Sequence, residues 1–488
     1  MQSKVPSEGV EPLKVASSEG ARSYDLAEVP VNASGHAQEL GRNFGFLSIA
    51  SMAITSGNTW ITFGGSITVA IYNGGPPGVI YEFIVVSVFY WLIAASIAEL
   101  ASAMPSAGGV YHWASITAGK YGRSVGFFAG WWNFLAWVFG LASTLQILAA
   151  QGVSMYAVMH PDFVPERWHV FVCYVIATWL LGFVCLFANR ALPTIEQVGG
   201  FLTLAGVFIS IIVCAVMPSK TGAGYASDAF VWKEWTNNTG YTSNGFVFLA
   251  GMLNGAFAVG TPDILSHMAE EIPRPSRNIP RAMLAQYVQA TGSSGGALGL
   301  LICAFLPVVV SISGIYLTAS RMCWTLARDN AMPFSNFFGR VNKKYENPFN
   351  AIVLCAAITT VLGCIYVGSS TAFSAFVGSF AILTSLSYLA AILPYLVRGR
   401  SGIVPGPFKM TGVLGFVVNT ISVLFMMVFI VIFCFPFALP VDAVSMNYAS
   451  LMTGGLTIFV AVYWFVCQKG YVGPKYVPVD ANLVEGAI

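Results

Sequence analysis

Two hydrophobic stretches of the sequence are interrupted near their centres. The first, within residues 44–72, contains a polar run followed by a tryptophan: Thr55, Ser56, Gly57, Asn58, Thr59 and Trp60. The second, within residues 245–271, is broken at Thr261-Pro262, directly after Ala256, Phe257, Ala258, Val259 and Gly260. An interrupted helix exposes backbone N–H groups at one end and carbonyls at the other, and these ends hold an anion and a cation.

The two interruptions lie five hydrophobic segments apart, which predicts a substrate site where two repeats of a membrane protein meet. The alternative is that glycine and proline only kink packed helices. Trp60, beside the first interruption, is the ring that we expect to contact a substrate. A quaternary ammonium group binds to ring faces through cation–π attraction, so choline should depend on such a ring more than an amino acid does. The other aromatic run, residues 130–137, could also offer ring faces to such a group, and the preferred alternative is that it packs against lipid or other helices.

Ionisable residues follow the second interruption. Asp263 and His267 are four residues apart and share one helix face, so they are candidates to carry a proton, to gate the cytosolic side, or to form a structural pair. Glu270 and Glu271 are expected to pair with basic residues of the cytosolic loops. Glu82 and Glu196 are expected at span ends, where they would mark the membrane interface.

The composition excludes several classes of function. Of 488 residues, 56% are hydrophobic and only 9% are charged, whereas soluble proteins carry about 25% charged residues. The cysteines show no metal-ligand spacing and are interpreted as packing residues. The sequence contains no nucleophile–base arrangement, phosphate loop, metal cluster or basic tract. We therefore expect no enzyme activity, no cofactor, no metal and no nucleic-acid partner.

Hydropathy predicts an all-α, multi-pass integral membrane protein, because a spanning helix needs roughly 20 apolar residues. A polar tail (1–43) comes first, and it is not a cleavable signal peptide. Two repeats (44–217 and 245–397), two further spans (412–468) and a second cytosolic tail (469–488) follow. The expected spans number eleven: 44–72, 78–103, 124–156, 168–188, 196–217, 245–271, 297–320, 350–368, 372–397, 412–436 and 446–468.

The placement of basic residues conflicts with this count. Short loops rich in Lys and Arg stay on the cytosolic side, and this places residues 218–244 outside, where Asn237 is a plausible glycosylation site. The loops around Arg274–Arg281 and Arg321–Lys344 are both basic, yet only one span is visible between them. One additional span there would correct every later loop. Either a span is absent, or residues 282–296 form a re-entrant element.

Three motifs carry a resemblance to a known family: AELASAMPSAGGVYHWA (98–114), HMAEEIPRPSRNIPRAM (267–283) and ASRMCWTLARDNAMPF (319–334). Over about residues 40–470 the chain resembles the amino acid–polyamine–organocation superfamily, and within it the fungal amino acid, gamma-aminobutyrate and choline permeases. The resemblance implies twelve spans, five plus five inverted plus two, and secondary transport by alternating access, usually driven by protons. It also implies that the residues of the two interruptions bind the substrate, and that a seventh span is lacking here.

The expected function is therefore a permease for a small amine or amino acid in a lipid bilayer, coupled to protons. The plasma membrane is preferred over the vacuolar membrane as its location. The alternative is a transport-inactive, permease-like protein that acts as a sensor or as the partner of a working permease.

Overall fold

The computed structural model describes residues 32–37, 39–67, 72–160, 162–222, 224–271, 274–278, 297–369 and 371–477. The predicted extra-span region (282–296) and most of the two tails lie outside these residues. Within the described part, nine helices are long and apolar enough to cross a membrane. They lie in α3 (Gly75–Ala103), α5 (Gly122–Met159), α6 (Arg167–Phe187), α7 (Leu192–Thr221), α11 (Ala297–Arg328), α13 (Phe349–Gly368), α14 (Ala372–Val397), α15 (Gly412–Ile432) and α16 (Ala449–Cys467).

Two further segments are interrupted, as the sequence predicts. Helix α1 (Phe46–Gly57) ends where Asn58 leaves helical geometry, and α2 (Thr59–Gly65) begins directly after it. Helix α9 (Asn244–Val259) ends before Thr261-Pro262, because a residue that precedes proline is disfavoured in the α conformation. The short 3-10 helix η4 (Ser266–Glu271) then continues the segment. Nine continuous and two interrupted segments agree with the eleven expected from hydropathy.

Short elements connect these segments. They are α4 (Val110–Thr117), α8 (Asp228–Trp232), α12 (Ser335–Phe338), η2 (Gly119–Tyr121), η3 (Asn189–Ala191), β1 (Asn73–Gly74) and β2 (Thr236–Asn237). Strands β1 and β2 pair antiparallel, with Asn73 opposite Asn237. This pairing joins the start of α3 to the loop before α9.

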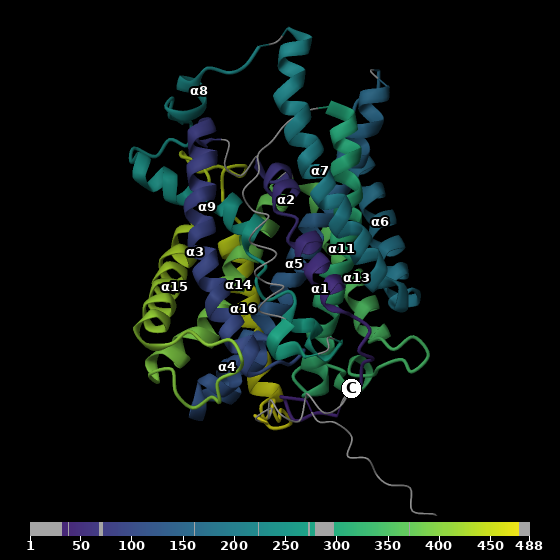
Figure 1. Cartoon of the computed structure of the whole chain (residues 1–488), viewed down its shortest axis with the longest axis vertical. Helices are drawn as coiled ribbons and strands as arrows, with labels where there is room; N and C mark the ends of the chain where they lie inside the picture. The colour runs from purple at the N-terminus through teal and green to yellow at the C-terminus, as the bar shows by residue number, and fades with distance from the viewer. Residues whose placement is uncertain are drawn as a thin grey trace, which may run out of the picture. The chain divides into compact units, whose positions relative to one another are not determined.

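The two interrupted segments lie among long helices (Figure 1). Helix α1 packs against α7 and α11, and α9 packs against α3 and α14. Helix α5 contacts α4, α11 and α14 and is buried over most of its apolar length. Helices α7 and α16 instead bury only a small share of their apolar length, with Phe201 72% and Phe465 73% accessible. Such apolar outer faces suit contact with lipid tails.

One boundary prediction was wrong. The seventh predicted span was expected to end at residue 320, with Arg321 and Arg328 in a loop, but α11 continues through both residues. The Arg321 side chain is fully buried and its Nε lies 2.9 Å from Glu271 Oε1. Arg328 Nη1 lies 3.3 Å from Glu270 Oε1. These ion pairs allow the helix to extend, and they confirm that Glu270 and Glu271 pair with basic residues.

Candidate functional site

A small hollow lies between the ends of the two long half-helices. The space inside it that no atom fills, open solvent included, is about 280 Å³. The last two residues of α1 and two residues near the end of α9 contribute to its wall. The full lining is Ser56, Gly57, Thr62, Trp137, Gly140, Thr144, Phe257, Ala258, Thr261, Ile315 and Phe380. None of these described lining residues is charged.

The direction of the half-helices gives the hollow its electrostatic character. Both α1, of 12 residues, and α9, of 16 residues, end at the hollow with their C-termini. A helix C-terminus carries unsatisfied carbonyls and a partial negative charge. Among the described helices that contribute to the wall through a half-helix end, the opposite polarity comes from α2, which has seven residues. The backbone around the hollow therefore favours a cation.

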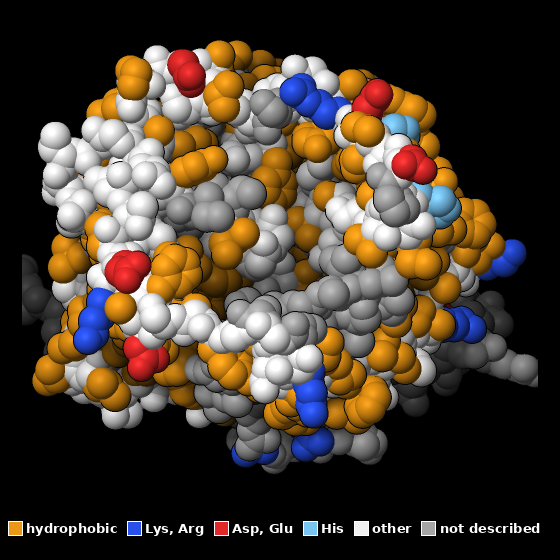
Figure 2. All heavy atoms as spheres, turned by 90° about the horizontal axis from the view of Figure 1, so that it is seen from above, with side chains coloured by type: hydrophobic (Ala, Val, Ile, Leu, Met, Phe, Trp, Pro, Cys, Tyr) orange, Lys and Arg blue, Asp and Glu red, His pale blue; other side chains and the backbone are white. Residues whose placement is uncertain are grey.

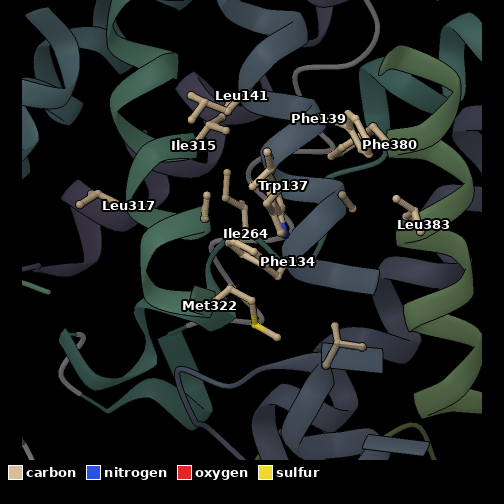
Figure 3. Close-up of a cluster of buried hydrophobic side chains, with 14 of the residues drawn as sticks. Phe134, Trp137, Phe139, Leu141, Ile264, Ile315, Leu317, Met322, Phe380 and Leu383 are labelled. Carbon is tan, nitrogen blue, oxygen red and sulfur yellow. The ribbon is translucent and has the colours of Figure 1, made fainter. Parts of the chain in front are cut away.

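Three aromatic rings line the hollow and contact one another. The ring centroids of Trp137 and Phe380 lie 5.7 Å apart at 77°, and those of Phe257 and Phe380 lie 5.5 Å apart at 86°. Figure 3 shows Trp137 between Ile315 of α11 and Phe380 of α14. Ring faces carry the negative part of an aromatic quadrupole, so they attract ammonium groups.

Asp263 lies beside the indole N–H of Trp137 and is fully buried. Its carboxylate accepts hydrogen bonds from Asn133 Nδ2 at 2.8 Å, Trp137 Nε1 at 3.3 Å and Tyr388 Oη at 2.5 Å. His267 Nε2 lies 3.1 Å from Asp263 Oδ2, as the four-residue spacing predicts. The interrupted segment is thereby tied to α5 and α14.

The end of the same segment after Asp263 is bonded to residues that lie early in the chain, and these in turn pair with residues late in the chain. Asn32 Nδ2 donates to Glu270 Oε1 at 2.8 Å. Lys475 and Val477 donate their backbone N–H groups to the carbonyls of Ser34 and Ala33. These contacts link the described N-terminal and C-terminal stretches, and Asn32 links them to Glu270.

The hollow lies at the two predicted interruptions, and four of the predicted residues line it. Ser56, Gly57, Phe257 and Ala258 line the hollow. The other predicted residues of the two interruptions are Thr55, Asn58, Thr59, Trp60, Ala256, Val259 and Gly260, and none of them is in the lining set. Substrate contact by Trp60 therefore stays a prediction.

Most of the remaining wall had no local signal in the sequence. Thr62, Gly140, Thr144, Ile315 and Phe380 are ordinary residues of hydrophobic helices, and only packing brings them together. Trp137 was visible within an aromatic run, but it was interpreted as a packing residue. Its indole N–H reaches Asp263 while its ring lines the hollow, so it does both.

The two glutamates that were expected to mark the membrane interface are buried between helices. Glu82 is 2% exposed and Glu196 is fully buried. Glu82 lies against Gly251 of α9. A side chain at position 251 would collide with the carboxyl group of Glu82. Glu196 lies in the first turns of α7, yet α1 and α11 cover it. Being near a helix end in sequence did not imply exposure, because neighbouring helices pack over both positions.

Asn237, the predicted glycosylation site, lies in β2 and is half-buried. Its Nδ2 donates to Tyr241 O at 2.7 Å and to Asn244 Oδ1 at 3.2 Å. A glycan on Nδ2 would leave one N–H, enough for one of these two bonds. As for metals, no group of three or more potential ligands occurs among the described residues.

Face-on, hydrophobic side chains surround the hollowed centre of the molecule, and the visible charged side chains lie towards its rim (Figure 2). This pattern suits a protein that passes small solutes rather than one that binds a polyanion.

Comparisons with known proteins show the family to which the chain belongs. The family model described as "Amino acid permease" matches residues 44–286 and 283–458. The chain is 30% identical to a choline transporter of Saccharomyces cerevisiae, over 94% of this chain and 85% of that protein. It is 27% identical to the transmembrane transporter swnT of Metarhizium robertsii (87% and 92% covered). It is 26% identical to the amino-acid permease BAT1 of Arabidopsis thaliana (92% and 96% covered).

The interrupted helices, the apolar spans and the family match over most of the sequence lead to one conclusion: this chain is a multi-pass membrane protein that belongs to the amino acid permease family.

Proposed function

We propose that this protein is a proton-coupled secondary transporter of small organic amines, with choline favoured over gamma-aminobutyrate and amino acids. The substrate binds between the end of α1 and the end of α9, and the protein alternates access around these interruptions. Its proposed location is the plasma membrane. The choline transporter relative supports this substrate class, as does the architecture of the hollow.

The observation that carries the proposal is the convergence of two carbonyl-bearing helix ends and three aromatic rings on one uncharged hollow. An ammonium group finds attraction from both sources without a charged side chain. A substrate carboxylate would need an N–H-rich partner, and the described wall offers only the short α2. A cation without a carboxylate therefore fits best.

Asp263 and His267 are proposed to act as a gate. Because Asp263 is bonded to residues of α5 and α14, the segment after α9 cannot move away without breaking these contacts. Trp137 joins this network to the hollow. A substrate that shifts the Trp137 ring would therefore bias the gate.

Uptake of labelled choline, gamma-aminobutyrate and amino acids should be measured in cells that lack their own carriers, with surface expression confirmed. We expect saturable choline uptake that is stimulated by external acid. Absence of uptake of every candidate, from protein present at the membrane, would refute active transport by this chain.

A second candidate function is a transport-inactive relative, and one observation favours it. The family match falls into two stretches that meet at residues 283–286, where the loop charges predict an absent span. The alignment with the choline transporter covers 497 positions. The alignment includes 94% of the 488 residues of this chain, which is about 459 residues. About 38 of the aligned positions therefore have a residue in the choline transporter and none in this chain. That number is enough for one span with its connections.

The two candidates are separated by restoring the segment. A chain in which the corresponding residues of the choline transporter are inserted between Gln286 and Gln289 is compared with the natural chain. Transport by both proteins supports the permease function. Transport by the lengthened protein alone indicates that the natural chain is an inactive form.

A further inference from the structure

Glu196 of α7 is a fully buried carboxyl group that the proposed gate does not use. Thr55 Oγ1 of α1 donates a hydrogen bond to its Oε2 at 2.5 Å, and Ser313 Oγ of α11 donates to its Oε1 at 2.8 Å. The carboxyl group therefore joins three helices. Among the described residues it forms no ion pair.

The charged and titratable surroundings of Glu196 are sparse. On α6, Cys185 Sγ lies 3.9 Å from the carbonyl oxygen of Ser313. On α11, Arg321 is the nearest described basic residue in sequence to Ser313, but its guanidinium is paired with Glu271. An ionised carboxylate without a partner is very costly in such an environment. Glu196 is therefore expected to be neutral when these helices are packed as observed.

The two hydroxyl groups can serve both protonation states of Glu196. Ser313 Oγ lies 2.6 Å from the Val310 carbonyl oxygen, and Thr55 Oγ1 lies 3.1 Å from that of Met52. Each hydroxyl has one hydrogen, which it can give either to Glu196 or to its own helix. When one hydrogen turns to the helix, that hydroxyl oxygen can accept the O–H of a protonated Glu196. Proton gain or loss thus needs only a hydroxyl rotation.

The same contact reaches the hollow. Ser56, the neighbour of Thr55, lines it. Gly314, the neighbour of Ser313, lies so close to Ser56 that a methyl group there would collide with the Ser56 hydroxyl. Movement of α1 against α11 must therefore alter the hollow and the Glu196 hydrogen bonds together.

We propose that Glu196 is the residue that carries the coupling proton, an inference that rests on the proposed function. A hydronium ion from the outside gives a proton to the carboxylate and leaves water. With the proton bound, α1, α7 and α11 pack closely, as seen here. When α1 moves and Thr55 separates from Glu196, cytosolic water takes the proton, and the carboxylate and hydronium are restored.

The test uses purified full-length protein in proteoliposomes, with Glu196→Gln as the variant and Glu82→Gln as the matched control. Glu82 is also buried in a spanning helix, but it lies on α3, away from Thr55 and Ser313. A gradient of about one pH unit sustains about tenfold accumulation per proton. Wild type and Glu82→Gln should reach this accumulation. Glu196→Gln should lose most of the accumulation but keep much more of the exchange of labelled for unlabelled substrate.

Accumulation by Glu196→Gln at the wild-type level would overturn the inference, and so would accumulation driven by a sodium gradient. Thr55→Val and Ser313→Ala each remove one hydroxyl group and keep the Glu196 carboxyl group, so they test the proton site even if Glu196→Gln misfolds. Each should shift the pH dependence of uptake.

If the wild-type chain moves no substrate, the proposed function fails, but the proton site can still be tested. Infrared spectroscopy should then show a buried carboxylic-acid band that is lost in Glu196→Gln, whereas Glu82→Gln should lose a different band, because Glu82 is a buried carboxyl group too. An identical spectrum for wild type and Glu196→Gln would contradict the inference.

Discussion

Replacing Phe380 by leucine separates ring attraction from simple packing at the hollow. Phe380 is 1% exposed and contacts the rings of both Trp137 and Phe257. Leucine keeps much of the apolar volume but removes the ring face. A cation–π contact contributes about 0.5–2 kcal/mol, and about 1.4 kcal/mol corresponds to tenfold in affinity. The dissociation constant for choline should therefore rise about twofold to thirtyfold.

The assay is equilibrium binding of labelled choline to purified protein, in competition with an uncharged analogue in which carbon replaces the quaternary nitrogen. The analogue should lose little affinity, because it makes no cation–π contact. Phe139→Leu is the matched control, since Phe139 is buried against Phe376 and does not line the hollow. Equal losses for choline and the analogue, or equal effects of the two substitutions, would refute the ring-attraction argument.

Three further predictions concern the gate, the cytosolic end and the outer loop. Asp263→Asn should abolish uptake and destabilise the protein by about 3 kcal/mol or more, since buried donors lose their charged acceptor; an unchanged melting temperature would contradict this. Burial lowers the pKa of His112 in α4 from 6.5 to about 4. Between pH 6.5 and about pH 4 the unfolded chain therefore binds more protons than the folded chain. The free energy of unfolding should fall by about 3 kcal/mol as the pH is lowered through this range. His112→Gln should show a smaller fall in thermal-melting experiments. Asn237→Gln should remove a glycosidase-sensitive mobility shift. Asn32→Gln, at the other Asn-x-Ser/Thr sequence (Asn32-Ala33-Ser34), should leave the shift in place, and a shift that survives Asn237→Gln would place the glycan elsewhere.

The features that local sequence determines were predictable. The length of each apolar run predicts a spanning helix. The two interruptions are predicted by Asn58, Thr261 and Pro262, because the local chemistry of these residues opposes a continuous helix. The four-residue spacing of Asp263 and His267 also predicted their contact.

The features that depend on a distant partner were not predictable. The charge of Arg321 predicts a loop residue, but in the structure Glu271, fifty positions earlier, pairs with it inside the protein. Glu196 looks like an interface residue until α1 and α11 cover it with hydroxyl groups. Phe380 is one aromatic residue among many, and only the packing of α14 against α5 and α9 brings it to the hollow.

The location of the substrate site is tested most directly by photoaffinity labelling with a light-activated choline analogue, followed by peptide mapping. The account predicts labels within residues 46–67 and 244–271 and on Trp137 or Phe380, all of them suppressed by excess unlabelled choline. Labels that lie outside these segments, or that excess choline does not suppress, would contradict it.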